Sequence, residues 1–120
     1  MDYKKYWTDM HSNLHHEQIK DLPHWYEQIA QIMDFWPFAY YPFYMKKSQW
    51  GLGVEDIHEK ELIDKDWEMI REFTKAVNAK GFPMFMGYEW QGAGKDGDHN
   101  VFFLDNDQMM HHPLRYTDLV

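Results

Sequence analysis

The chain has 120 residues and a mass of 14.7 kDa, which suits a single domain spanning residues 1–120. Hydrophobic residues make up 44% of the chain and aromatic residues 18%, a composition that excludes a disordered segment. The net charge of −8, without a basic run, argues against a nucleic-acid partner and favours cations. Because there is no cysteine, disulfides, thiol chemistry and cysteine-ligated zinc are excluded.

Neither a secretion signal nor a membrane span is expected. Residues 1–6 lead into a polar stretch without the apolar core of a signal peptide. The longest apolar run, residues 35–45, contains two prolines and is shorter than the roughly 20 residues of a membrane helix. We therefore expect a cytoplasmic protein without a membrane partner.

The first half of the chain predicts a strand, a helix and a second strand. Residues 6–13 predict a short strand, and residues 17–33 have the helical spacing of apolar side chains. Pro23 is expected to separate the first turn of this helix from the rest. The aromatic run 35–43 predicts a buried strand, and the polar, glycine-containing stretch 46–61 predicts a loop.

The second half predicts a helix and two further strands. Residues 64–80 predict a helix capped by Asp64, with an apolar face directed to the core. Residues 82–90 are the most strand-like segment, the glycine-rich stretch 91–98 predicts a loop, and residues 100–104 predict a last short strand. The order of elements indicates an α/β fold with a mostly parallel sheet.

Ligand-capable side chains fall at the ends of three predicted strands. Asp9, His11 and Asn13 share one face of the first strand because side chains alternate along a strand. Glu89 follows the apolar part of its strand, and a buried carboxylate needs a cation. His99 enters the last strand from a glycine loop, which holds an imidazole well for ligation.

Each of these groups also has a purely structural reading. The first cluster, taken alone, is more typical of a capped strand end that contains a hydrogen-bonded histidine. Glu89 can pair with Arg71 or Lys75 on the helix instead of with a metal ion. A single histidine in the position of His99 is often structural. The three clusters together favour a metal site, because divalent metal ions bind histidine and carboxylate side chains drawn from several elements.

Three segments resemble motifs of one protein family. Residues 6–13 are similar to the opening Tyr-Trp-Gly-Asp-Leu-His motif of the PHP (polymerase and histidinol phosphatase) superfamily, closest to its PHP-like bacterial branch of unknown function. Residues 82–90 resemble its "pGyEW" strand, and residues 97–101 resemble its "GHxNV" element. The resemblance implies a distorted TIM-like (β/α)7 barrel. A TIM-type barrel needs roughly 200 residues or more, so this chain would hold only an incomplete, N-terminal portion of it.

The resemblance also implies two or three divalent metal ions, with Zn, Mn or Fe as the cofactor. His11, Glu89 and His99 would be metal ligands, and Asn13 would take the position where many members have a second histidine. The chain departs from the family at the end of the second strand, where Tyr41 stands in place of an expected histidine ligand. The later ligands of the family lie on strands beyond residue 120.

The expected function is that of a metal-dependent hydrolase acting on a small-molecule phosphoester or related ester, with Tyr41 and Trp90 lining the substrate pocket. The alternative is a non-catalytic PHP-like binding module, for a carbohydrate or an acidic small molecule, with a degenerate metal site. An incomplete barrel leaves an open strand edge, so we also expect self-association. Five other histidines are expected to be exposed: His15, His16, His58, His111 and His112.

Overall fold

The structure is a computed structural model that describes residues 2–92 and 96–115. Four strands form one sheet in the order β1-β2-β5-β6, with bounds β1 (Ser12–His15), β2 (Trp36–Tyr41), β5 (Met84–Gln91) and β6 (Asp98–Phe102). A separate hairpin is formed by β3 (Phe43–Lys47) and β4 (Gly53–Ile57). The helices are α1 (His16–Ile19), α2 (Leu22–Ile29) and α3 (Lys60–Ala79).

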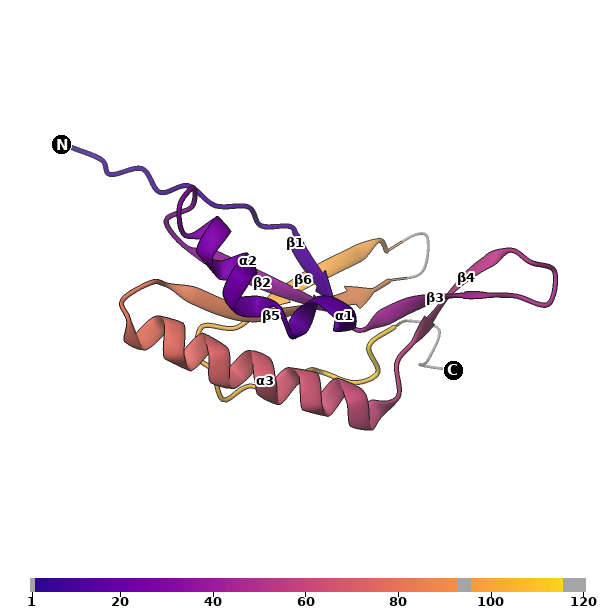
Figure 1. The fold of residues 1–120 in the computed structure, drawn as a ribbon. Coiled ribbons are helices and arrows are strands. Elements are labelled where there is room, and N and C mark those ends of the chain that lie inside the picture. The colour runs from indigo at the N-terminus through magenta and orange to yellow at the C-terminus, as the bar shows by residue number, and fades with distance from the viewer. Residues whose placement is uncertain (1, 93–95, 116–120) are drawn as a thin grey trace.

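The sheet is mixed, and the predicted α/β fold with mostly parallel strands is confirmed. Strands β1, β2 and β5 run parallel to one another, and β6 is antiparallel to β5. Strands β1 and β6 lie at the two edges of this sheet. Helix α3 runs along one face of the sheet, while the β3–β4 hairpin extends away from it (Figure 1).

The hydrophobic core lies between the sheet and the helices. Alternate residues of β2 and β5 point toward α3, and they are almost fully buried: Trp36, Phe38, Tyr40, Met84, Met86 and Tyr88. Helix α3 contributes one face at helical spacing, as predicted, and its buried apolar members are Ile63, Trp67, Ile70 and Val77. Complete burial of each large apolar side chain contributes roughly 1.5–3 kcal/mol, so this layer fixes the position of the sheet.

The prediction of a strand over residues 6–13 is wrong for most of that segment. The backbone of Trp7 bonds to Asp34, and the hydroxyl of Thr8 donates to the Phe35 carbonyl, so this part lies beside the start of β2. The Asp9 side chain then accepts a hydrogen bond of 2.8 Å from the backbone N–H of His11. Such a side-chain turn competes with ladder pairing, and the regular strand therefore begins only at Ser12.

The prediction of a loop over residues 46–61 is also wrong, because β3 and β4 pair as an antiparallel hairpin from Phe43↔Ile57 to Lys47↔Gly53. Gly51, with φ of 75°, supplies the left-handed conformation in the connection. Lys46 and Asp56 form an ion pair across the two strands. Polar residues on an exposed hairpin have no apolar face to reveal their alternation, which is why the sequence pattern reads as a loop.

The helices follow the prediction with shifted boundaries. The helix expected over residues 17–33 is divided into α1 and α2, with Pro23 in the first turn of α2 as predicted. Helix α3 begins one turn earlier than expected, at Lys60, and Asp64 pairs with Lys60 at 2.5 Å instead of capping the helix. Within the described ranges, no helix combines the length and the apolar character needed to cross a membrane.

Candidate functional site

A cavity of about 550 Å³ lies at the carboxyl end of the parallel strands, on the face of the sheet opposite the core. Its walls come from all four strands of the main sheet or the segments next to them. The lining residues are Asp9, Met10, His11, Asn13, Tyr41, Glu89, Asp98 and Asn100. Four of the six residues proposed from the sequence as site residues therefore meet here: His11, Asn13, Tyr41 and Glu89.

The register of the sheet explains why side chains from different strands converge. Asn13 pairs with Ala39, and Ala39 pairs with Gly87, so these three residues form one row across the sheet. Residues two positions further along a strand point to the same face. Tyr41 and Glu89 therefore share a face with Asn13, and Asn100 joins them because it pairs directly with Glu89.

Residues 9–11, which precede β1 and were predicted to be part of the first strand, form the opposite wall of the cavity. The Asn100 side chain on β6 donates a hydrogen bond of 3.2 Å to the Met10 carbonyl, although β6 and β1 are at opposite edges of the sheet. Residues 9–11 therefore cross over the face of the sheet toward β6. The turn at Asp9, which interrupts the segment predicted as a strand, is thus the feature that closes the cavity.

Glu89 is the buried charge at the centre of the site, with 5% of its surface exposed. The Asn13 amide donates a hydrogen bond to its carboxylate, and His11 Nε2 lies 3.9 Å from the same oxygen. Burial raises the pKa of the Glu89 carboxyl, and the negative charges of Asp98 and Glu55 raise it further against the opposing effects of Asn13 and His11. The contacts of Glu89 therefore compensate its negative charge only in part.

The two helix cations suggested as partners of Glu89 are engaged elsewhere. Arg71 pairs with Glu68 and donates to the Asn106 and Gln108 carbonyls. Lys75 lies 3.4 Å from Asp107. The structural reading of Glu89 as a salt-bridge partner of α3 is therefore wrong.

Two amide oxygens beside Glu89 are buried without a donor. Asn13 Oδ1 and Asn100 Oδ1 have no hydrogen-bond partner among the described residues. The orientation of each amide is set by its other end, because Asn13 donates to a carboxylate and Asn100 donates to a backbone carbonyl, and both of these groups only accept. A buried acceptor left unpaired costs about 1–3 kcal/mol, so each of these two oxygens favours a hydrogen-bond donor or a cation beside it.

Tyr41 lines the cavity but is not free to act as a phenolate ligand. Its hydroxyl donates to Glu55 on β4, and Gln91 donates to that hydroxyl at 3.1 Å and to Glu55. Burial raises the pKa of the Tyr41 phenol, and the hydrogen bond to Glu55 raises it further. The phenol therefore stays protonated, and it connects the hairpin to the site.

The structure does not bring His99 and Trp90 into the cavity. These residues pair with each other across β5 and β6, so they lie on the face opposite Glu89 and Asn100. His99 is exposed, with Nε2 3.0 Å from the Asp96 carbonyl, and Trp90 donates to the Pro113 carbonyl at 3.1 Å. Sequence reasoning missed Asn100, which directly follows His99 in the same motif.

Three of the five histidines predicted to be exposed are exposed, namely His15, His111 and His112. The prediction is wrong for His16 and His58, which are half-buried. His16 bonds to the buried Asp66 on α3, and the His58 ring packs 5.3 Å from that of His16. Asp66 of α3 contacts His16, and Tyr44 and His16 pack against His58, so the burial of both histidines depends on residues outside their own local sequence.

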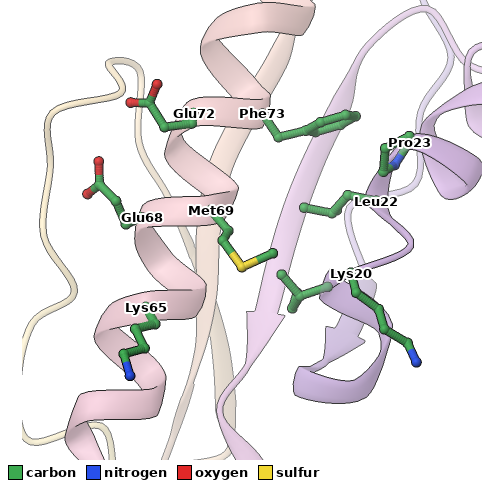
Figure 2. Close-up of a pocket in the computed structure, with 9 residues that line it drawn as sticks. Lys20, Leu22, Pro23, Lys65, Glu68, Met69, Glu72 and Phe73 are labelled. Carbon is green, nitrogen blue, oxygen red and sulfur yellow. The ribbon is translucent and has the colours of Figure 1, made fainter.

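A second groove lies elsewhere, between α3 and the α1–α2 segment, with a volume of about 660 Å³. Figure 2 shows Met69 and Phe73 of α3 facing Leu22 and Pro23 across it, while Glu68 points away. Its floor is apolar, and its charged side chains are at the rim. This groove has none of the convergent polar atoms of the Glu89 cavity.

Within residues 2–92 and 96–115, no group of three or more histidine, aspartate or glutamate side chains already has the arrangement of a metal site. Two of the donor groups around Glu89 are asparagine amides, which do not belong to these residue types. Comparisons with protein-family models, curated proteins and solved structures find no match to this chain. The functional argument therefore depends on the geometry of the cavity.

Proposed function

We propose that the Glu89 cavity binds a divalent metal ion and that the protein is a metal-dependent hydrolase of PHP-like type, acting on a phosphoester or related ester. In this proposal the chain is the N-terminal portion of a TIM-like barrel. The observation that carries it is the pair of unpaired, buried amide oxygens, of Asn13 and Asn100, beside the buried carboxylate of Glu89.

The donor atoms suit a hard or borderline cation. Glu89 supplies a carboxylate, and Asn13 and Asn100 supply amide oxygens, which are ligands that Mg²⁺ and Mn²⁺ accept. His11 lies at the rim with most of its side chain exposed, and its imidazole extends the choice to Zn²⁺ or Fe²⁺. Asp9 and Asp98 add negative charge at the walls.

Glu89, Asn13 and Asn100 would hold a divalent ion here, and such an ion would supply Lewis acidity toward an ester oxygen and a bound water. The residues of the chain do the remaining work. Asn13 holds the Glu89 carboxylate in place, and the Tyr41–Glu55–Gln91 hydrogen bonds fix one wall of the cavity. His11 has an accessible imidazole at the mouth, and imidazole is the group that enzymes use most often for proton transfer.

The second candidate function is a binding module that keeps the scaffold without catalysis. The placement of His99 on the opposite face favours it, because the cavity then has one histidine instead of two. A catalytic metal needs about three protein ligands and an open position for water. A site made mainly of amides binds a cation more weakly than one made of imidazoles and carboxylates.

Metal content and turnover test the two functions together. The chain is grown with Mn, Fe and Zn, and bound metal is measured in the wild type, in Glu89→Gln and in the exposed control Glu61→Gln. Phosphomonoesters, phosphodiesters and sugar esters are then assayed with each metal, on this chain and on the longer protein that the barrel proposal implies. Bound Mn²⁺ and turnover lost in Glu89→Gln and kept in Glu61→Gln support the hydrolase. Bound Mn²⁺ with sugar or acid binding and without turnover supports the binding module, and a wild type without bound Mn²⁺ refutes the site.

A further inference from the structure

A second cluster of titratable side chains lies on the core side of the sheet, away from the Glu89 cavity. Asp66 on α3 is 3% exposed and accepts two hydrogen bonds on the same oxygen, from the Tyr40 hydroxyl at 2.5 Å and from His16 Nδ1 at 2.8 Å. These contacts join β2, α1 and α3. The function proposed above uses none of these residues.

Asp66 sets the tautomer of His16. A carboxylate accepts hydrogen bonds, so the proton of the His16 ring lies on Nδ1 and faces Asp66. In the neutral ring, the second nitrogen, Nε2, then carries the lone pair. Histidines that bind metal ions in proteins are nearly always held in this way, with the other ring nitrogen donating to a carboxylate or a carbonyl.

His58 brings a second imidazole to the same place. It follows β4, its ring stacks on Tyr44 with centroids 4.7 Å apart, and its Nε2 is buried without a hydrogen-bond partner among the described residues. A neutral imidazole is the form that binds metal ions, so the unpartnered Nε2 is the nitrogen through which His58 would bind one.

We propose that His16 and His58 form a two-imidazole binding site for a borderline transition-metal ion such as Zn²⁺, with Asp66 orienting His16. The ring centroids of the two histidines are 5.3 Å apart. Two imidazoles bound to one tetrahedral zinc ion through bonds of about 2.0 Å place their centroids about 5 Å apart. The two rings therefore already have the spacing that a shared ion requires.

Open space reaches the His16 side of the pair. His16 and Asp66 line a cavity of about 280 Å³ together with Glu17 and Lys20, and His58 is not among its lining residues. Because the site has two imidazoles and not three ligands in place, water completes the shell, and the binding is weaker than in a structural zinc site. Two nitrogen donors favour Zn²⁺, Ni²⁺ or Cu²⁺, whereas the mainly oxygen donors around Glu89 favour Mn²⁺ or Mg²⁺.

A titration of the ¹⁵N-labelled chain with Zn²⁺ tests this site, using long-range ¹H–¹⁵N spectra that report the ring nitrogens of each histidine. We expect the Nε2 signals of His16 and His58 to shift together. His16→Gln and His58→Gln should each weaken the affinity for Zn²⁺ at least tenfold. Asp66→Asn keeps the shape of the side chain and should weaken it about 10- to 100-fold, as for other residues that orient a ligand.

Two control variants separate this site from the rest of the chain. His24→Gln removes an exposed histidine of α2 and should leave the affinity unchanged, and Glu89→Gln should leave the His16 and His58 shifts unchanged. The proposal is overturned if saturating Zn²⁺ shifts neither ring or only one of them. It is also overturned if His16→Gln leaves the response of His58 intact. The spectra of the wild type decide the question even if a variant fails to fold.

Discussion

The burial of Glu89 leads to a prediction about the free energy of unfolding of the wild type and of the variant Glu89→Gln. A bound metal ion should reverse which of the two proteins is the more stable. Glu89→Gln keeps the volume of the side chain and its capacity to accept the hydrogen bond from Asn13, but it removes the charge. In the presence of a chelator, we expect this variant to be more stable than the wild type at neutral pH. With saturating Mn²⁺, the wild type should become the more stable protein.

The size of the effect depends on the hydration free energy that the Glu89 carboxylate loses on burial and on the part that its contacts in the protein restore. Removing an ion from water costs several kcal/mol after relaxation of the protein. Glu89 is 5% exposed and recovers only part of this cost, through one amide donor and through an imidazole 3.9 Å away. We expect a net gain of about 1–2 kcal/mol for the variant, which is roughly 4–8 °C in Tm for a chain of this length.

The pH dependence has the same origin and a defined sign. Because the pKa of the Glu89 carboxyl is raised in the folded state, the native protein binds more protons than the unfolded chain between the ordinary pKa of 4.5 and the raised value. The free energy of unfolding of the metal-free wild type therefore falls as pH rises through this window. The variant should lack this slope.

The assay is thermal and urea unfolding of both proteins with chelator and with Mn²⁺, from pH 4 to pH 8. Binding at a concentration 100 times Kd adds about 2.7 kcal/mol to the wild type. The control Glu61→Gln changes a side chain that is 85% exposed and should stay within about 0.5 kcal/mol of the wild type throughout. A metal-free Glu89→Gln less stable than the wild type would refute the reasoning, since it would mean that the charge is already compensated.

Two further predictions concern the sheet. Gly87→Ala should destabilise the chain by about 1–3 kcal/mol in urea unfolding, because its Cβ would lie 2.5 Å from the Val101 carbonyl oxygen and 2.9 Å from that of Phe38. Gly53→Ala, whose Cβ meets only the terminal methyl of Met45 at 2.9 Å, is the matched control, and equal losses would contradict this account. The edge strands β1 and β6 should support self-association in light scattering, whereas a monodisperse 14.7 kDa monomer would count against it.

The sequence by itself determined the elements that bury large apolar faces. The aromatic run that became β2 and the apolar segment that became β5 were predicted because bulky side chains in short runs suit buried strands. The apolar face of α3 followed from its helical spacing. The presence of a ligand-capable carboxylate at Glu89 was also visible, because a charged residue ends an otherwise apolar strand.

Only the tertiary structure decided which side chains meet. Apart from Phe43 and Ile57 at its base, the hairpin of β3 and β4 does not face the core, so its pairing is absent from the sequence signal. The burial of His16 depends on Asp66, 50 residues away in the chain.

The choice between His99 and its neighbour Asn100 as a wall of the cavity depends on the β5–β6 register. A shift of one residue in that register exchanges the two faces of a strand, and local sequence does not determine it.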